Sequence, residues 1–366
     1  MNAARIPFLS LVPGEDVDDV RAAIDRVIAR GWFVLGPEVE AFEEEFAAAS
    51  GAACAVGVGS GTDAIALALR ALGIGAGDEV ITAPLSAAYT ALAIMMIGAR
   101  PVFADIDPAR LTIDPDRIRA AIGPRTRAVV PVHLYGQAAD MTAIERIAAD
   151  HRLAVVEDCC QAHLGAAAGR PIGTIGAAGA FSFYPTKNLG ALGDGGAIVT
   201  NDRALAAALR RLRNGGQADR YRHVEAGVNS RLDELQAAVL RARLPRLRAW
   251  TDRRRELAAR YRDRLAGAPV VVPPECDSGH VYHLFVVRSR QREALRRQLL
   301  DRGVETLVHY PMTIPRQPAL RGQQAAECPV AAQACDEVLS LPLHHRLRDR
   351  EVDEVAAAVK EIPCVL

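Results

Sequence analysis

The residues whose types and spacing could do chemistry begin with a lysine. The chain has 366 residues and 44 lysine and arginine side chains, yet only Lys187 and Lys360 are lysines. An arginine stays protonated at any accessible pH, whereas a lysine can lose its proton and act as a nucleophile. Lys187 precedes the glycine-rich run 193–196, a poor setting for a solvated lysine, whereas Lys360 lies on the polar side of a C-terminal helical pattern. The sequence therefore predicts a covalent catalytic role for Lys187.

Two acids, Glu157 and Asp158, follow an apolar strand pattern upstream of that lysine. Ligands bind beyond the carboxyl ends of parallel strands, although a lone acid there often only caps a turn. A pyridoxal phosphate enzyme needs a carboxylate against its pyridine nitrogen. The negative charge keeps that nitrogen protonated, so that the ring can accept electrons. With Lys187 downstream, the pair predicts a pyridoxal phosphate site. His163, in the same segment, is either an active-site contact or a structural hydrogen-bond partner.

A glycine-rich turn at 57–63 separates a strand pattern from a helical one. Backbone N–H groups at such a helix N-terminus cradle phosphate. The Ser182 hydroxyl, on the strand that enters the lysine loop, could donate to the same phosphate. A dinucleotide-binding turn is the alternative, but its acid belongs at the far end of the next strand. Here Asp78 and Glu79 precede that strand, which disfavours the alternative.

Composition excludes several classes of function. The formal net charge is zero, with 44 acidic and 44 basic residues, so nothing indicates a nucleic-acid or membrane-surface partner. No apolar run approaches the roughly 20 residues that cross a bilayer, and the first residues do not look like a signal peptide. The cysteines are scattered without a metal-type C-x-x-C pair, so we expect no metal and a reduced, cytoplasmic protein. They are Cys54, Cys159, Cys160, Cys276, Cys328, Cys335 and Cys364.

Helical and strand patterns alternate through the first two thirds of the chain, which predicts an α/β fold with a mostly parallel sheet covered on both faces. We expect helices at 18–30, 38–49, 62–72, 87–96, 114–121 and 141–150, and strands at 53–58, 79–83, 101–104, 128–133, 154–157, 180–183 and 197–200. A long helical stretch at 232–265 with a break at Pro245, a strand at 283–287 and helices at 292–302 and 351–359 follow. We therefore expect a large domain over 1–245 and a smaller α+β domain over 246–366.

Several motifs resemble those of the DegT/DnrJ/EryC1/StrS family of pyridoxal phosphate-dependent sugar aminotransferases, which have the type I, aspartate aminotransferase-like fold. The resemblance runs almost end to end, and its most specific parts are the lysine motif, the Asp158–Gln161 pair and the Asn-x-Arg-x-Asp-Glu-Leu-Gln run at 229–236. The matching segments are 59–64, 77–82, 101–105, 132–137, 157–163, 181–187, 227–236, 309–311 and 339–343.

The resemblance implies roles for individual residues. Lys187 would bind pyridoxal 5′-phosphate covalently and then move a proton between the donor Cα and the cofactor C4′ carbon. Asp158 would pair with the pyridinium nitrogen, and Gln161 would contact the ring hydroxyl region. Gly61, Thr62 and Ser182 would hold the phosphate. Asn229 would reach the phosphate of a neighbouring subunit, which implies a homodimer with shared active sites. Tyr89, Tyr135, His163, His309 and Tyr310 are further candidates for substrate contact.

One position departs from the family pattern. Members usually carry an aromatic residue that stacks on the cofactor, in a Thr-Phe or Thr-Trp pair after the strand at 79–83, where this chain has Ser86-Ala87. Either Tyr89 supplies that face, or the cofactor packs against smaller groups.

The function that the resemblance implies is amino transfer from an amino acid, L-glutamate above all, to a nucleotide-linked keto sugar. The segment 132–137 looks more like members that act at sugar C3, which favours a 3-keto-6-deoxyhexose; Tyr135 in it could line the cleft or be a core ring. Alternatives are a 4-keto sugar or cyclitol (inosose) aminotransferase, a regulator that keeps the cofactor as a sensing ligand, and a nicotinamide-dependent oxidoreductase.

Overall fold

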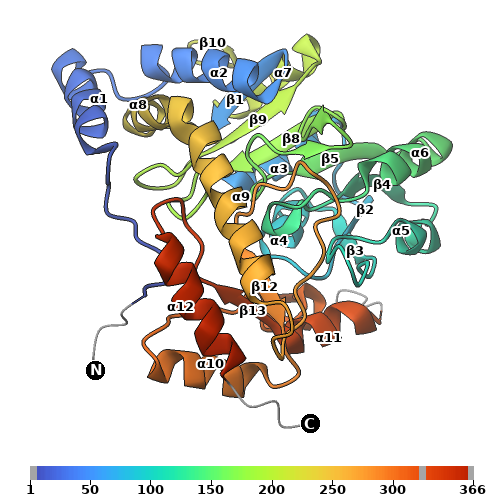
Figure 1. Cartoon of the computed structure of the whole chain (residues 1–366). Helices are drawn as coiled ribbons and strands as arrows, with labels where there is room; N and C mark the ends of the chain where they lie inside the picture. Colours follow the sequence, from blue (N-terminus) through green and yellow to red (C-terminus); the bar gives the residue numbers. More distant parts are fainter. Residues whose placement is uncertain (1–5, 321–326, 362–366) are drawn as a thin grey trace.

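A seven-stranded sheet forms the centre of the larger part of the protein (Figure 1). The computed structural model describes residues 6–320 and 327–361; Cys364, one of the predicted free thiols, lies outside them. The strand order is β1-β9-β8-β5-β4-β2-β3, and β9 runs antiparallel to both of its neighbours. The strands are β1 (Cys54–Val58), β2 (Glu79–Thr82), β3 (Arg100–Phe103), β4 (Thr126–Val130), β5 (Ala154–Asp158), β8 (Ala178–Ser182) and β9 (Gly196–Thr200). The predicted mostly parallel sheet is confirmed.

Helices cover both faces of this sheet. One face packs against α3, α4 and α7, and the other against α2, α5, α6 and α8. Local sequence fixes several helix ends: Ser60 caps α3 by accepting the Asp63 N–H at 3.1 Å, and Gly51 ends α2 in the left-handed region. The helices are α1 (Val17–Arg30), α2 (Pro37–Ser50), α3 (Gly61–Ala71), α4 (Tyr89–Met96), α5 (Pro115–Ala121), α6 (Met141–His151), α7 (Arg203–Leu212) and α8 (Glu234–Arg243).

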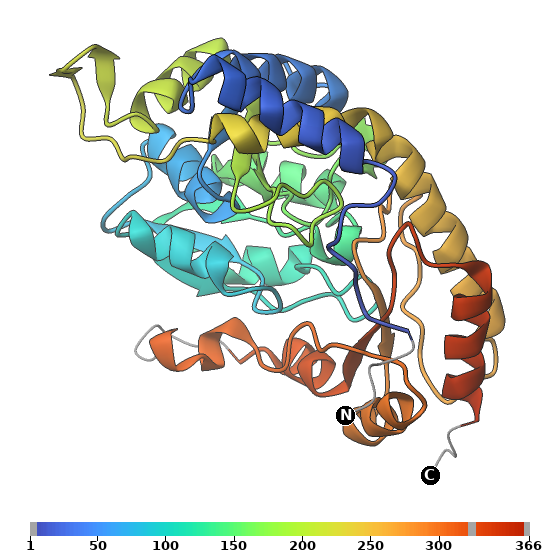
Figure 2. The same ribbon diagram turned by 90° about the vertical axis from the view of Figure 1, so that its left-hand side faces the viewer.

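The C-terminal part has its own apolar cluster, which α9 (Leu247–Arg264), α10 (Arg292–Asp301), α12 (Asp349–Lys360) and the antiparallel pair β12 (Phe285–Arg288) and β13 (Val338–Leu341) build. Tyr261 and Phe285 stack at its centre with ring centroids 4.7 Å apart. The N-terminal segment joins this part, because Ile6 lies in the same cluster and bridges to Val304 (Figure 2). By contrast, α11 (Pro329–Glu337) packs on the larger core.

Short elements complete the description. They are the two-stranded pairs β6 (Ala166–Ala167) with β7 (Arg170–Pro171) and β10 (Gln217–Asp219) with β11 (Arg222–His223), and the 3₁₀ turns η1 (Leu134–Gly136), η2 (Leu244–Arg246), η3 (Ile314–Arg316) and η4 (Pro318–Leu320). None of the described helices is long and apolar enough to span a membrane.

The predicted break in the long C-terminal helix falls where Pro245 lies. Helix α8 ends at Arg243, a 3₁₀ turn covers Leu244–Arg246, and α9 begins at Leu247. Proline has no backbone N–H and clashes with the preceding turn, which explains the interruption. Helices α7 and α11 and strand β13 were not predicted, and neither were the short strands β6, β7, β10 and β11.

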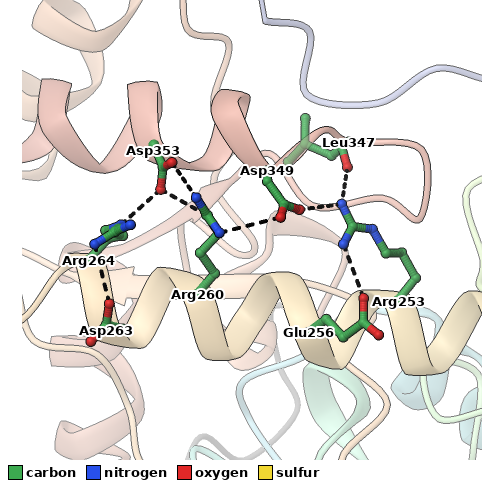
Figure 3. A network of polar contacts seen from close by, with 8 residues as sticks. All are labelled: Arg253, Glu256, Arg260, Asp263, Arg264, Leu347, Asp349 and Asp353. Atoms are coloured by element: carbon green, nitrogen blue, oxygen red, sulfur yellow. Dashed lines mark hydrogen bonds and ion pairs between the residues drawn. The ribbon is translucent and has the colours of Figure 1, made fainter.

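Helices α9 and α12 are held side by side by charged groups (Figure 3). Arg260 donates to Asp353 at 2.8 Å, and Arg264 donates to the same carboxylate at 2.9 Å. Arg253, about two turns before Arg260 on α9, donates to Asp349 at 2.6 Å and to the Leu347 carbonyl at 3.1 Å. The network therefore ties the beginning of α12, and the loop before it, to α9.

Candidate active site

The candidate site lies at the carboxyl edge of the central sheet, where β5 ends at Asp158 and β8 ends at Ser182. These strands are parallel neighbours, so their last residues meet at one edge. The N-terminus of α3 packs against the same edge. A Cβ atom at Gly61 would lie 2.7 Å from both the Cys160 Sγ and the Ser182 Cβ, so this contact requires a glycine.

The beginning of α3 offers backbone donors at this edge. The side chain of Ser60 accepts the Asp63 N–H, and the Ser60 carbonyl accepts the Ala64 N–H at 3.0 Å. The N–H groups of Gly61 and Thr62 precede the first intrahelical bonds and stay available to an external acceptor. With the Ser182 hydroxyl close by, the predicted phosphate residues come together at one helix N-terminus, where the helix dipole favours an anion.

Lys187 follows β8 in a tight turn, in which its N–H donates to the Tyr184 carbonyl at 2.8 Å. Burial of the amine lowers the pKa of Lys187, and the nearby Cys160 and Asp158 oppose that shift. Because the charged form is disfavoured, a larger fraction of the amine is neutral at a given pH than for an exposed lysine. Lys360, at the end of α12, is exposed. The structure thus separates the two lysines as the sequence predicts.

Asp158 is buried and held through both carboxylate oxygens. The Thr90 hydroxyl, in the first turn of α4, donates to Oδ2 at 2.7 Å, and the Cys160 N–H donates to Oδ1 at 3.1 Å. Thr90 is itself 2% exposed. Two elements far apart in sequence therefore fix one carboxylate beside the lysine.

Gln161 links the sheet edge to the C-terminal part. Its Oε1 accepts the Tyr135 N–H at 2.8 Å, and its Nε2 donates to the Tyr310 hydroxyl at 3.1 Å. The Tyr135 hydroxyl donates to the His309 carbonyl, and the ring is 5% exposed, which fits a core ring with a satisfied hydroxyl. Burial raises the pKa of Tyr310 to about 12, although the Gln161 hydrogen bond opposes the shift. The contact between Gln161 and a cofactor stays a prediction.

His163 and His309 lie close enough to Lys187 for its charge to lower their pKa values, after the larger effect of burial. His163 Nε2 lies 2.9 Å from the Ser182 carbonyl, and its buried Nδ1 has no partner among the described residues. Its pKa falls to about 3, so the ring is neutral and Nε2–H donates. His309 Nδ1 lies 2.9 Å from the Ser340 hydroxyl. The structural hydrogen bond of His163 is therefore present, and its Nδ1 atom is available for a second hydrogen bond.

Asn229 is exposed, whereas its neighbour Ser230 is buried against the phosphate turn. The Ser230 hydroxyl donates to Asp63 at 2.8 Å and accepts the Gly59 N–H at 2.9 Å. These bonds fix the segment that carries Asn229 beside the turn at 57–63 and leave the Asn229 side chain accessible.

Comparison with known proteins agrees with this geometry. A model of the DegT/DnrJ/EryC1/StrS aminotransferase family matches residues 15–360. The chain belongs to this family. It is 47% identical to dTDP-3-amino-3,4,6-trideoxy-alpha-D-glucose transaminase from Streptomyces venezuelae, over 98% of this chain and 96% of the relative. It is 46% identical to the erythromycin biosynthesis sensory transduction protein EryC1 from Saccharopolyspora erythraea, over 97% and 99%. The crystal structure of S. venezuelae DesV in complex with a ketimine intermediate superimposes with a TM-score of 0.95 and 48% identity, covering 98% of both chains.

The fold is therefore the type I fold of this family, and the protein is a pyridoxal phosphate-dependent aminotransferase. The residues present fit the cofactor. A helix N-terminus and a hydroxyl meet where a phosphate would lie. A buried carboxylate is available for the ring nitrogen, and a lysine with a lowered pKa lies near that carboxylate. When bound, pyridoxal phosphate withdraws electrons from the carbon that carries the amino group.

The departure at Ser86-Ala87 leaves Tyr89 as the aromatic side chain at the start of α4. Tyr89 is 64% exposed, and its hydroxyl is close enough to Tyr310 to contribute to that residue's raised pKa. Ser86 is 5% exposed. Tyr89 is thus accessible at the rim of the family's cofactor site, and a stacking role stays a prediction.

Glu157, the other acid at the end of β5, belongs to a different cluster. It is fully buried and accepts N–H donors from Gly173 at 2.9 Å, Ile175 at 2.9 Å and Gly176 at 2.8 Å. His133 Nδ1 accepts the Ala139 N–H, so its Nε2–H donates to Glu157 at 3.1 Å. Cys159 completes a group with metal-ligand atoms within 4.8 Å of one another. Because protein donors already occupy the carboxylate, the cluster is built as a structural hydrogen-bond network.

Two residues at the site escaped prediction. Thr90 gives no signal in a single sequence, because a threonine in an apolar helix reads as part of the core. Cys160 looked like one of several scattered thiols, yet it lies beside Gly61, Asp158 and Lys187, and burial raises its pKa well above the ordinary value. Its N–H donates to Asp158 at 3.1 Å.

Proposed function

We propose that the protein transfers the amino group of L-glutamate to C3 of a nucleotide-linked 3-keto-6-deoxyhexose. The observation that carries this proposal is the pairing of Lys187, whose pKa is lowered, with the doubly held carboxylate of Asp158 at the sheet edge. Similarity to a transaminase that is named for a 3-amino dTDP-sugar supports the substrate and the position of amination.

Lys187 is the proposed catalytic residue. It would hold the cofactor covalently until the amino group of the donor takes its place, and its Nζ would then accept the proton from the Cα atom of the donor. A base with a burial-lowered pKa suits this step, because a larger fraction of it is neutral than of an exposed lysine. The same amine later returns a proton to the carbon of the sugar that receives the nitrogen. The two half reactions alternate on one site, which gives ping-pong kinetics.

The remaining candidate residues hold and orient the cofactor and the substrates. Asp158 keeps a positive charge on the cofactor's ring nitrogen, and Gly61, Thr62 and Ser182 bind the phosphate. Gln161 is hydrogen-bonded to Tyr310, which belongs to the C-terminal part, and so links that part to the site. Gln161 also contacts the ring hydroxyl region of the cofactor. We assign substrate contacts to Tyr89, His163, His309 and Tyr310, and treat Tyr135 as their support, because its hydroxyl is bonded to His309.

A homodimer is part of the proposal. Exposed apolar side chains at Trp32, Phe33 and Val34 lie next to α2, and a second copy would cover them. Asn229 is exposed beside the phosphate turn and would reach the phosphate of the partner. We further propose a division into a large domain over 1–245 and a small domain over 246–366, to which the segment around Ile6 also packs. Free cysteines support a cytoplasmic location.

The test is a substrate panel. The purified, cofactor-loaded protein is incubated with L-glutamate and with dTDP- and UDP-linked 3-keto and 4-keto 6-deoxyhexoses, and the product is identified by NMR. We expect nitrogen on C3. Nitrogen on C4 alone would support the 4-keto alternative, and amination of an inosose without any sugar product would support a cyclitol aminotransferase.

A second candidate function has one observation in its favour, since a relative at 46% identity is named a sensory transduction protein. A regulator would bind pyridoxal phosphate without turning it over. If the loaded protein releases no 2-oxoglutarate from L-glutamate, with or without any keto sugar, the regulator reading replaces the enzyme.

A further inference from the structure

A cavity of about 280 Å³ lies beside the lysine loop. Its walls come from the N-terminal segment 9–14, from the lysine loop at 185–192, from Trp250 and Arg254 of α9, and from the loop 344–346 before α12. Figure 2 shows the N-terminal segment running from the C-terminal part to α1. The cavity thus shares a wall with Lys187 but is lined mainly by groups that the proposed mechanism does not use.

Arg254 is the most unusual of these groups. Its side chain is 4% exposed, and its Nη1 donates to the carbonyls of Tyr282, His283 and Leu343 at 3.2, 3.4 and 3.0 Å. Its Nε is buried without a partner, and no carboxylate of the described residues forms a salt bridge with it. Burial lowers its pKa to about 10, so it remains charged at pH 7. A buried charge without a counter-charge is costly, and such groups are normally paired.

His344 adds a second unsatisfied group to the same wall. It is 8% exposed, and both of its ring nitrogens are buried without partners in the described parts of the chain. Burial lowers its pKa to about 4, with Arg254 contributing, so the ring is neutral at pH 7 and has one N–H to donate. By contrast, Arg243 in this cavity is already neutralised by Asp16 at 2.7 Å.

The walls are held in place before any ligand arrives. The network in Figure 3 fixes the loop that carries His344, because Arg253 of α9 bonds the Leu347 carbonyl and Asp349. On the opposite side, Arg346 donates to the Ser10 carbonyl at 2.9 Å and so ties the N-terminal segment down. A preorganised donor set of this kind binds a ligand without paying to order its own side chains.

We propose that this cavity binds a carboxylate of the amino-acid donor, with Arg254 and His344 as its donors. The inference rests on the proposed function for the identity of the ligand. An unpaired guanidinium matches a carboxylate, which it bonds more strongly than a neutral acceptor. The volume lies just below the usual range for drug-sized ligands, so a small dicarboxylic acid fits better than a nucleotide sugar. Lys187 belongs to the lining of the cavity, which brings the donor to the lysine loop.

Trp250 makes binding measurable without turnover. It lines the cavity and stacks on His345 at 4.4 Å between ring centroids. In a Trp32→Phe background it is the sole tryptophan of the chain. Glutarate, which lacks the amino group and cannot react, is titrated into the cofactor-loaded protein while the emission of Trp250 is followed. We expect saturable binding, weakened about tenfold or more in Arg254→Lys and in His344→Leu, since each loses a hydrogen-bond donor to a charged group.

The control is Arg248→Gln, an exposed arginine of the same helix, which should bind glutarate as the parent does. Arg254 also supports three backbone carbonyls, so the folded state of each variant is checked by circular dichroism. His344→Leu leaves those carbonyls bonded and keeps the inference testable if Arg254→Lys unfolds. In steady state, both variants should raise KM for L-glutamate while the single-turnover rate of sugar amination from the aminated enzyme is unchanged.

Three results would overturn the inference. They are equal glutarate affinity in the parent and His344→Leu, absence of binding to the parent, and displacement of glutarate by inorganic phosphate or dTDP at equal or lower concentration. The last would mark a phosphate site instead. The proposed function is judged separately, by whether the parent aminates a keto sugar. If the parent aminates no sugar but binds glutarate, and the variants lose that binding, the cavity assignment stands and the proposed function is rejected.

Discussion

Glu157 and Asp158 are adjacent acids at the end of one strand, and they belong to two different regions of the molecule. Glu157 points to the side on which three backbone N–H groups and His133 fill its oxygens. Asp158 points to the lysine side and receives one hydroxyl and one N–H. Because successive side chains of a strand face opposite sides of the sheet, the same strand supports a structural network and a cofactor site.

The difference teaches how to distinguish a structural acid from a functional one. An acid whose oxygens are all occupied by protein donors has no capacity left for a ligand. An acid with spare capacity beside a lysine of lowered pKa can still bind one. The sequence cannot make this distinction, since both acids follow the same apolar run. Substitutions on each side of the strand test this distinction.

The largest effect is expected on the lysine side. Lys187→Arg should keep the fold and lose at least about 10⁴-fold in turnover, because arginine holds the charge but can neither bond the cofactor covalently nor give up a proton near pH 7. The matched control is Lys360→Arg, at the exposed end of α12, which should be fully active. Borohydride reduction and peptide mapping should place the pyridoxyl group on Lys187. A label on Lys360 would reject the assignment.

Asp158→Asn should lower kcat by about 10²- to 10³-fold, the usual loss when one preorganised charge is removed from an active site. The amide can still accept from Cys160 and donate to the Thr90 hydroxyl, so the free energy of unfolding should change little. Cofactor binding should persist in part. Full activity in this variant would contradict the role of the charge.

Glu157→Gln should have the opposite effect and lower the free energy of unfolding rather than kcat. One carboxylate oxygen becomes an NH₂ group that faces backbone N–H donors, and each buried donor left unsatisfied costs about 1–3 kcal/mol. Two donors lose their acceptor whichever way the amide is turned, so the free energy of unfolding should fall by at least ~2 kcal/mol. Chemical denaturation measures this, with Asp158→Asn as the comparison. A Glu157→Gln protein as stable as the parent, but inactive, would reverse the assignment of the two acids.

Much of this could be predicted from the sequence, for reasons visible in single residues. The continuous apolar strands and the Pro245 break follow from local chemistry, and Lys187 stood out because arginine replaces lysine almost everywhere else. Helix α7 was not predicted, although Asp202 caps it, because three of its ten residues are arginines next to a run of alanines. The Thr90–Asp158 bond and the Arg254 cavity join residues far apart in sequence, so no local pattern reports them.

Thr90 offers a smaller, sharper test of the lysine side. Thr90→Val keeps the shape of the side chain but removes the hydroxyl that orients Asp158, and should lower kcat about tenfold, the effect of ~1.4 kcal/mol. Thr90→Ser should restore activity, because it restores the hydroxyl. A purely structural role would leave the pH dependence of the bound cofactor's absorbance unchanged, whereas a positioning role shifts it. Activity and absorbance that are unaltered in Thr90→Val would remove Thr90 from the site.

Substitution of a third carboxylate, Asp353 on α12, is expected to have a smaller effect than the substitutions at Asp158 and Glu157, and provides a reference for both. Its hydrogen bonds from Arg260 and then Arg264 lower its pKa from the ordinary 3.8 to about 2 (Figure 3). A depressed pKa in the folded state means that the contribution to stability is complete above pH 4 and is lost as the pH falls towards 2. The pair is solvent-screened, so the change in Tm for Asp353→Asn should be small at pH 7 and should vanish near pH 2. Asp150→Asn, at an exposed position outside the network, is the control. A Tm difference that grows on acidification would contradict the assigned pKa direction.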